Sequence, residues 1–263
     1  MTNRHGSWIW YELMTPDAAA SKAFYDTVVG WNIDTDSATP GDVEYRMIVA
    51  SDGNAGGMLT LNADMLAGGA KPGWLGYVGV DDVDATVENL KAAGGAIHMP
   101  PHDIPGVGRM AMVADPQGVP FYVMRGASDE DSTAFQRMGL GHVSWNELQT
   151  SDATAAFDLY NTLFGWEKAG GIQMPWGEYS FLRNKDAGEA MDAVWGAMMP
   201  REKPEHPVGW TFYFRVPDIE AAHATVSELG GTPLTDPMEV PGGERVFHAT
   251  DPHGAVFGLV APK

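Results

Sequence analysis

The chain has 263 residues, of which 44% are hydrophobic and none is cysteine. The missing cysteines exclude disulfides, thiolate metal sites and a cysteine nucleophile, and no apolar run reaches the roughly 18 residues of a membrane-spanning helix. The formal net charge of −19, from 35 acidic and 16 basic residues, repels phosphate backbones and anionic lipid, so we expect no nucleic-acid and no membrane partner. The first residues lack the long apolar segment of a secretion signal, so cytoplasmic localisation is the default expectation.

The first predicted elements are a strand and a helix. Residues 7–13, "SWIWYEL", alternate and are rich in aromatic residues, which is typical of a strand. Thr15 and Pro16 are suited to the N-cap and first position of a helix, and Gly30 is suited to end it. The residues expected on the buried face of this helix are Ala20, Phe24, Thr27 and Val28.

The same order of elements then recurs. Strands are predicted at 44–50 and 55–61, followed by a further strand at 74–80, "WLGYVGV". A second helix is predicted from Asp82 and ends at the Gly94–Gly95 pair, and strands are predicted at 109–114 and 120–125. The apolar residues on one face of the second helix are Val83, Val87 and Leu90.

The second half of the chain repeats the first. Residues 10–31 and 145–166 are identical at 11 of 22 positions without a gap, and "DPQGVPFYV" at 115–123 returns as "DPHGAVFGL" at 251–259. A repeat of this length indicates duplicated structural units. The acidic stretch between the copies is predicted to be a linker. The predicted organisation is domain 1 at 1–126, a linker at 127–137 and domain 2 at 138–263.

Each half therefore contains two strand–helix–strand–strand(–strand) units. This order favours an α+β fold, in which helices cover one face of a curved mixed sheet and the other face is left to enclose a cavity.

Several of these motifs resemble those of a known family. "FYDTVVGW" and "LYNTLFGW" end the first helix of each half, a Gly-Gly pair follows the second helix, and the "DPQG" and "DPHG" turns precede the last strand. Their joint spacing resembles the vicinal oxygen chelate superfamily of glyoxalase I, bleomycin-resistance proteins and extradiol dioxygenases, and most of all its tandem two-domain members. The resemblance implies four βαβββ motifs, paired into U-shaped sheets around ligand pockets.

The resemblance also implies where a metal would bind, on the first and last strands of the motifs. Catalysis there needs three or four N or O donors around one cation. None of the eight positions in this chain carries a usual donor. They are Trp10, Met58, Leu75 and Tyr122 in the first half and Trp145, Ala197, Thr211 and Gly258 in the second. We therefore predict no metal ligand and no cofactor.

The eight histidines do not supply another metal site. No two of them have HxH spacing on a strand or HxxxH spacing on a helix, and the prolines of "HMPPH" at 98–102 exclude a helix there. His248 lies on a predicted strand of the second half only, because its counterpart in the first half is Met112.

The side chains that replace the metal ligands are mostly aromatic. Alternation along the first strand of each half places Trp10 beside Glu12, and Trp145 beside Glu147, on the face that the resemblance assigns to the pocket. The predicted ligand-binding residues are Trp10, Met14, Met58, Leu75, Tyr77, Tyr122, Trp145, Tyr213 and Arg215.

Glu12 and Glu147 are the candidate catalytic residues. A carboxylate in a pocket can act as a general acid or base, or bind an amine or hydroxyl of a ligand. The alternative is structural: both carboxylates would pair with Arg109 and Arg245, which recur with them, or with buried backbone donors near the interface.

Three binding or catalytic functions remain open at this stage, beside a structural or interaction protein with closed pockets. The first is metal-free binding of a small planar or aromatic molecule, in a resistance or detoxification role. The second is a metal-dependent glyoxalase-type lyase or dioxygenase, and the third a metal-free oxygenase or isomerase with a pocket Glu as acid or base and Tyr122 as a donor. The expected partner is a small-molecule ligand, and the chain is expected to be a monomer with paired domains or a homodimer.

Overall fold

The computed structural model of the chain describes residues 3–39, 43–185 and 187–263. The chain forms two compact units, and each takes one motif from either half of the sequence. Unit 1 comprises Met1–Ile9, Gly76–Ser132 and Trp145–Trp210. Unit 2 comprises Trp10–Leu75, Thr133–Ser144 and Thr211–Lys263. The compact units are therefore not the same divisions of the chain as the two sequence repeats.

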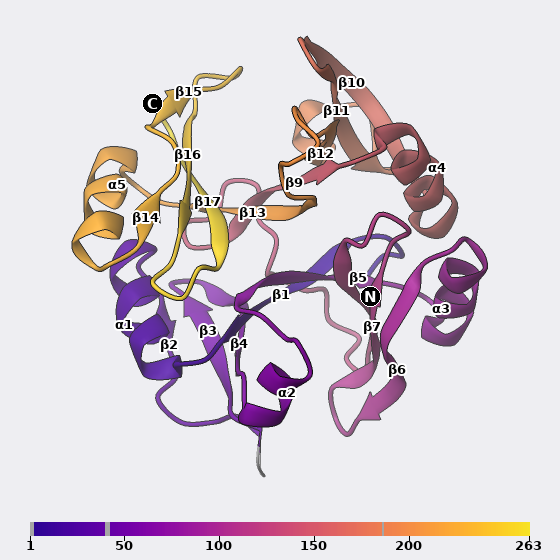
Figure 1. Ribbon diagram of the computed structural model, residues 1–263, viewed down its shortest axis with the longest axis horizontal. Helices are drawn as coiled ribbons and strands as arrows, with labels where there is room; N and C mark the ends of the chain where they lie inside the picture. The colour runs from indigo at the N-terminus through magenta and orange to yellow at the C-terminus, as the bar shows by residue number, and fades with distance from the viewer. Residues whose placement is uncertain (1–2, 40–42, 186) are drawn as a thin grey trace. The chain divides into compact units, whose positions relative to one another are not determined.

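Unit 2 holds the first motif of the first half and the second motif of the second half (Figure 1). Its elements are the greater part of β1 (Trp8–Thr15), α1 (Ala18–Val28), β2 (Asn32–Ile33), β3 (Tyr45–Ala50), β4 (Gly53–Thr60), α2 (Ala63–Ala67), the greater part of β13 (Gly209–Arg215), α5 (Ile219–Glu228), β14 (Thr232–Pro233), β15 (Met238–Glu239), β16 (Arg245–Thr250) and β17 (Val256–Ala261). The strand orders are β2-β3-β4-β1 and β13-β17-β16-β14, and β15 pairs with β16. Helices α1 and α5 contact each other and lie side by side in Figure 1.

Unit 1 holds the two complementary motifs. Its elements are most of β5 (Gly73–Gly79), α3 (Val83–Ala92), β6 (Ala96–Ile104), β7 (Gly108–Ala114), β8 (Pro120–Gly126), most of β9 (Val143–Thr150), α4 (Ala153–Phe164), β10 (Trp166–Met174), β11 (Gly177–Asn184), the short helix η1 (Met191–Ala193) and β12 (Val194–Pro200). The strand orders are β5-β8-β7-β6 and β10-β11-β12-β9, and α3 contacts α4.

The strands of every motif form mixed sheets, as predicted for an α+β fold. β1 runs parallel to β4 while β3 runs antiparallel to it, and β9 and β12 repeat the parallel pairing in the second half. β5 with β8, and β13 with β17, are the parallel pairs of the second motifs. The strands and the two helices predicted for the first half are present. Strand β6, which contains both prolines of "HMPPH", was not predicted from the sequence. Prolines are tolerated in β6 because it is the edge strand of its sheet.

The start of α1 differs from the prediction. Asp17, not Thr15, is the N-cap, and its carboxylate accepts a hydrogen bond from the Ala20 amide at 2.9 Å. Pro16 consequently precedes the helix instead of opening it. The Thr15 hydroxyl lies 2.7 Å from the Ser21 hydroxyl, so it ties the end of β1 to the helix. The end was predicted correctly: α1 closes at Val28, and Gly30 follows with a φ of +85°.

The buried face of α1 also differs. Phe24 and Val28 are buried as predicted, but Ala20 and Thr27 are not on the buried face. Their places are taken by Ser21 and Tyr25, whose polar groups have hydrogen-bond partners inside unit 2. For the second helix the prediction was correct: Asp82 caps α3, and the expected apolar residues are buried.

Aromatic side chains fill the core of each unit. In unit 2 the Tyr25 ring lies 5.5 Å from each of the rings of Trp31, Trp74 and Phe257. In unit 1 the Trp166 ring lies 4.5 Å from that of Trp195. Each fully buried ring of this size stabilises the fold by roughly 2–3 kcal/mol through the hydrophobic effect.

Polar atoms within these cores bond across the two halves of the sequence. The Trp31 indole donates to the Gly141 carbonyl at 2.6 Å in unit 2, and the Trp166 indole donates to the Gly6 carbonyl at 2.7 Å in unit 1. Both tryptophans end the repeated "GW" motif, so this motif serves to join segments of different halves inside each unit.

No helix among the described residues is long and apolar enough to cross a membrane.

Candidate functional site

Among the described residues, α1, α3, α4 and α5 pack against strands of their own units, and we call the opposite face of the strands the helix-free face. On β16, Phe247 packs against His223 of α5, with ring centroids 4.9 Å apart. On β8, Phe121 packs against Tyr160 and Phe164 of α4. Because side chains alternate along a strand, the neighbours His248 and Tyr122 point away from these helices. The predicted site residues were assigned to this helix-free face.

In unit 2 the helix-free face of β1 carries Trp10, Glu12 and Met14. The opposite face meets α1 through the contact between Thr15 and Ser21. The Trp10 indole donates to the Tyr45 hydroxyl at 2.7 Å, and Glu12 is only 3% exposed. Glu12 pairs with Gly57 on β4, where a β-carbon would collide with the Tyr45 hydroxyl. A glycine there lets the Tyr45 ring lie across the sheet beside Glu12.

Unit 1 repeats this arrangement with residues of the second half. The Trp145 indole donates to the Tyr179 hydroxyl at 2.9 Å, and that hydroxyl donates to Glu147 Oε2 at 2.7 Å. Burial along β9 alternates, with Trp145, Glu147 and Gln149 on the less buried side. A tyrosine hydroxyl can accept one hydrogen bond and donate another, so the chain indole–phenol–carboxylate uses both capacities.

The two tyrosines of this arrangement, Tyr45 and Tyr179, were not predicted from the sequence. Tyr45 pairs with Leu59 on β4, and Leu59 in turn pairs with Met14. The adjacent register of β11 and β12, in which Ser180 pairs with Met198, puts Tyr179 at the corresponding place in the second half. Tyr45 and Tyr179 are 134 residues apart, whereas Trp10 and Trp145 are 135 residues apart, because the intervening loops differ in length. An ungapped comparison of the two halves therefore does not align the two tyrosines.

The register places Met58 on a different face from the one predicted. Met58 pairs with Leu13 and is fully buried, so its side chain lies on the same side of the sheet as Leu13, away from Glu12. Leu59, the partner of Met14, occupies the predicted face instead. A one-residue shift of register exchanges the two faces of a strand. The spacing of residues in the sequence does not determine this register.

The second motif of the first half contributes a stacked pair to its helix-free face. The rings of Tyr77 and Tyr122 lie 4.2 Å apart at an angle of 17°, and the two residues pair directly between β5 and β8. Met112 pairs with Tyr122 from the other side. Leu75, earlier on β5 and assigned to unit 2, is buried.

The second motif of the second half has different side chains at the same positions. Tyr213 pairs with Gly258, and Gly258 pairs with His248. The Tyr213 hydroxyl lies 2.5 Å from His248 Nε2. Arg215 is 2% exposed, forms an ion pair with Glu244, and its Nε donates to the Arg137 carbonyl at 3.2 Å.

The recurrent arginines are bound to helix carboxylates. Arg109 forms two hydrogen bonds with Asp84 of α3, at 2.6 and 2.8 Å, and a third with Asp103 at 3.1 Å. Arg245 pairs with Glu220 of α5, at the equivalent helix position. These partners contradict the structural alternative in which Arg109 and Arg245 neutralise Glu12 and Glu147. Glu147 instead accepts a hydrogen bond from the Tyr179 hydroxyl.

Six of the eight expected metal positions carry no donor suited to a cation, and the hydroxyls of Tyr122 and Thr211 at the other two are uncommon ligands. Indole, thioether and aliphatic groups are not ligands for hard or borderline divalent ions. Among the residues that the structure describes, no three His, Asp or Glu side chains gather in a way that could hold a metal ion. The donor set therefore does not fit the metal centre that the resemblance implies.

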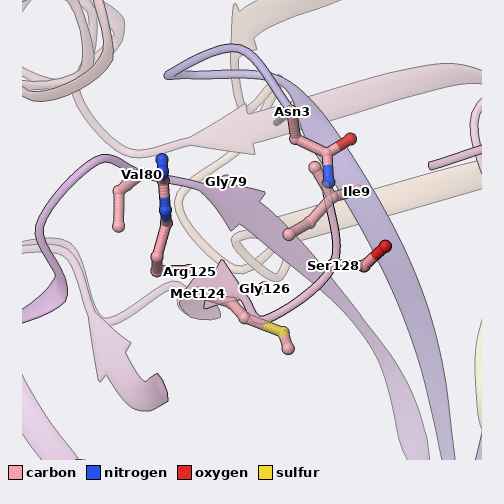
Figure 2. A pocket seen from close by; sticks show the side chains of 8 residues that line it. All are labelled: Asn3, Ile9, Gly79, Val80, Met124, Arg125, Gly126 and Ser128. Carbon is pink, nitrogen blue, oxygen red and sulfur yellow. The ribbon is translucent and has the colours of Figure 1, made fainter. Parts of the chain in front are cut away.

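Two small depressions lie within unit 1. Figure 2 shows the first, at the ends of β5 and β8, with a volume of about 10 Å³; this is room for about one water molecule. The second is an open groove of about 360 Å³ at the start of α4, where Lys168 and Glu178 form an ion pair. Neither is lined by a predicted site residue.

The duplicated mixed-sheet motifs place the chain in a class of proteins built from tandem copies of one domain. The chain belongs to the Glyoxalase/Bleomycin resistance protein/Dioxygenase superfamily, whose family model matches residues 9–123 and again residues 139–259. The resemblance drawn from the sequence and the tandem organisation are thereby confirmed. The exact domain boundaries and the linker at 127–137 stay a prediction.

Two relatives match almost the whole chain. The putative glyoxylase CFP32 of Mycobacterium tuberculosis is 30% identical over 259 residues, which cover 98% of this chain and 96% of that protein. The anthracycline biosynthesis protein DnrV of Streptomyces peucetius is 32% identical, covering 97% of this chain and 93% of that protein.

Solved structures share the fold at low identity. The Mn(II)-bound glyoxalase from Novosphingobium aromaticivorans has a TM-score of 0.64 and 16% identity, covering 98% of this chain and 82% of its own. Homoprotocatechuate 2,3-dioxygenase from Arthrobacter globiformis has a TM-score of 0.65 and 13% identity, covering 99% and 80%.

Proposed function

We propose that the chain binds a small, flat aromatic molecule on its helix-free sheet faces, without a metal ion. The observation that carries the proposal is the recurring tryptophan–tyrosine pair beside a carboxylate. Trp145, Tyr179 and Glu147 form one hydrogen-bonded chain, and Trp10 and Tyr45 form the same pair beside Glu12. The position of the expected first-strand metal ligand thus carries an indole in both halves, with a carboxylate two residues later.

This combination suits a planar ligand with a polar edge. Aromatic rings stack on flat molecules in offset or edge-to-face geometry, and each such contact contributes about 0.5–1.5 kcal/mol beyond the burial of area. The indole bond fixes the orientation of the Tyr179 hydroxyl, so little side-chain freedom is lost when a ligand binds. Met14 and Met199, on the same faces of β1 and β12, can adapt to the outline of a ligand.

One relative supports this class of ligand. The name of DnrV assigns it to anthracycline biosynthesis, and anthracyclines contain flat, fused aromatic rings. The match extends over nearly the full length of both chains. A binding role, such as sequestration of a toxic aromatic compound or its positioning for another protein, would fit the class and needs no metal.

Two enzymatic alternatives have some support. A metal-dependent lyase or dioxygenase accords with the glyoxalase and dioxygenase relatives, but the chain lacks a fitting donor set in the described residues. A metal-free oxygenase or isomerase accords with the hydrogen bond between Tyr179 and Glu147, because a carboxylate held at 2.7 Å from a phenol is placed to exchange its proton.

Calorimetric titration with anthraquinone, an uncharged fused-ring probe, tests the proposal. We expect saturable binding, and we expect Trp145→Ala or Trp10→Ala to remove the sites one at a time. Met138→Ala, which alters a side chain that is 70% exposed, serves as the control and should bind like the native chain. Absence of binding to the native chain would refute the aromatic-ligand proposal. Stoichiometric Mn, Fe, Ni or Zn that survives dialysis would instead favour the metal-dependent alternative.

A further inference from the structure

The two halves differ in chemistry at two neighbouring positions of their helix-free faces. The first half has Tyr77, Tyr122 and Met112 side by side on three strands. The second half has Tyr213, Gly258 and His248 at the same places. An imidazole thus replaces a thioether, and a glycine replaces the ring on which the first-half tyrosine stacks.

Glycine at 258 allows the second-half tyrosine to reach the histidine. A β-carbon at this position would collide with the Tyr213 ring, so the ring lies directly over the backbone of β17. From there the Tyr213 hydroxyl meets His248 Nε2 at 2.5 Å, a short contact for a phenol and an imidazole. In the first half, Tyr122 occupies the corresponding space and Tyr77 stacks on it instead.

The backbone around His248 is held in place. Its amide donates to the Thr235 hydroxyl at 3.0 Å, and its carbonyl accepts from the Leu234 amide at 2.8 Å. The imidazole is therefore presented from a fixed strand. Arg215, which shares this face of β13, is engaged by Glu244.

We propose that Tyr213 and His248 form an acid–base pair that takes up the proton of a ligand hydroxyl, and that only the second half does so. This inference rests on the proposed binding of flat aromatic molecules. It adds that the second half recognises a hydroxyl group on such a molecule. In the step, the ligand O–H bond breaks and its proton passes to the Tyr213 oxygen, while the Tyr213 proton passes to His248 Nε2. The products are a ligand oxyanion and an imidazolium, and no electrons are transferred.

The acidities of the partners define the class of ligand. A plain phenol is a weak acid, so the transfer of its proton through Tyr213 to the imidazole is unfavourable. Conjugation of the hydroxyl with a ring carbonyl makes it much more acidic and brings the two groups closer in pKa. The chemistry therefore favours a hydroxyquinone or a similar aromatic enol over a plain phenol.

The ionisation of a bound probe tests the inference. 2-Hydroxyanthraquinone changes its visible absorption when its hydroxyl loses a proton, so its spectrum reports the fraction of phenolate at a fixed pH. At a pH where the free probe is half ionised, we expect the bound probe to be almost wholly phenolate. We expect His248→Met, which introduces the first-half residue, and Tyr213→Phe each to abolish the shift and weaken binding of this probe about tenfold.

A matched control separates the imidazole from general effects. His223→Met makes the same exchange on the helix side of the sheet, where His223 packs on Phe247, and should leave the shift intact. Anthraquinone, which lacks the hydroxyl, should bind native and His248→Met chains alike. If anthraquinone binds but 2-hydroxyanthraquinone gains no phenolate, or if His248→Met keeps the shift, the acid–base pair is wrong while the binding proposal stands. If neither probe binds the native chain, the proposed function itself fails.

Discussion

The Tyr160 hydroxyl donates a hydrogen bond to Asp115 Oδ2 at 2.9 Å, inside unit 1. Tyr160 belongs to "LYNTLFGW" of the second half, and Asp115 opens the "DPQG" turn of the first. The equivalent pair in unit 2 is Tyr25 and Asp251, at 3.2 Å. The residues that make the two halves look alike thus form bonds between the halves. The repeat is explained by packing within each compact unit as much as by the site.

A double-mutant cycle will measure this bond. Tyr160→Phe should lower the free energy of unfolding by about 1–3 kcal/mol, because it leaves a buried carboxylate without one of its donors. Asp115→Asn should also destabilise the chain, since Asp115 Oδ1 accepts from the Gln117 and Val119 amides and an amide group must reproduce that turn. Because both changes break the same bond, the double variant should lose about 1–2 kcal/mol less than the sum of the single losses. Strictly additive losses in urea unfolding would contradict the coupling.

The cost of Asp115→Asn should depend on pH. Burial raises the pKa of Asp115 above its usual 3.8, against the lowering effect of its hydrogen bonds. The folded chain therefore holds the proton more tightly than the unfolded chain. The stabilising contribution is complete below the unfolded pKa and is lost as pH rises through the folded pKa. Asp115→Asn should accordingly cost more free energy at about pH 4 than at about pH 7, and an equal or reversed cost in urea unfolding would show that the carboxyl is not desolvated.

Alkaline conditions should act through the buried tyrosines. Burial, together with the nearby Asp115 and Asp251 carboxylates, raises the pKa of Tyr160 and of Tyr25 well above 10.0. Both phenols stay protonated in the folded chain at a pH where the unfolded chain ionises. Stability should therefore decline as pH rises beyond about 10. The decline should be shallower for Tyr160→Phe, and ultraviolet absorbance of tyrosinate should rise together with unfolding and not before it.

The tandem fold could be predicted because its signals are local and occur twice. Strand alternation, the glycine that ends α1 and the apolar face of α3 depend on residues close in sequence. The N-cap was misplaced because Thr15 and Asp17 are both good caps, and only the structure shows that the Thr15 hydroxyl is bound to Ser21. Tyr25 was not predicted on the buried face because it carries a polar hydroxyl. The partner that allows this hydroxyl to be buried, Asp251, lies 226 residues away in the sequence.

The candidate site was harder to predict for a different reason. Trp10, Glu12, Trp145 and Glu147 were recognised from alternation along one strand. The hydrogen-bond partners of Trp10, Trp145 and Glu147 come from other strands. Their positions depend on sheet register, which cannot be inferred across loops of unequal length. The same dependence on register moved Met58 to the other face. Whether the predicted residues bind a ligand stays a prediction.

Two glycines allow a test of how tightly the segment before β1 is held. Gly6 and Gly30 both have left-handed backbone conformations, with φ of +80° and +85°. An alanine β-carbon at Gly30 would meet no atom within 4 Å, whereas at Gly6 it would collide with the Phe164 carbonyl of the other half. Gly30→Ala should cost about 1–2 kcal/mol from backbone strain alone. Gly6→Ala should cost several kcal/mol more in urea unfolding, and similar losses for the two variants would show that the segment moves aside freely.

Gly258→Ala tests whether the tyrosine–histidine contact depends on the space that glycine leaves. The added methyl group would displace the Tyr213 ring, while every donor and acceptor atom of Tyr213 and His248 remains in the chain. We therefore expect this variant to behave like His248→Met with 2-hydroxyanthraquinone: the phenolate fraction should fall to that of the free probe. Gly209→Ala is the control, because a β-carbon there meets nothing within 4 Å. If Gly258→Ala instead keeps the full phenolate signal and normal stability, the Tyr213 ring must reach His248 without lying over β17. The difference between Gly258 and Tyr122 would then not explain why the two halves differ.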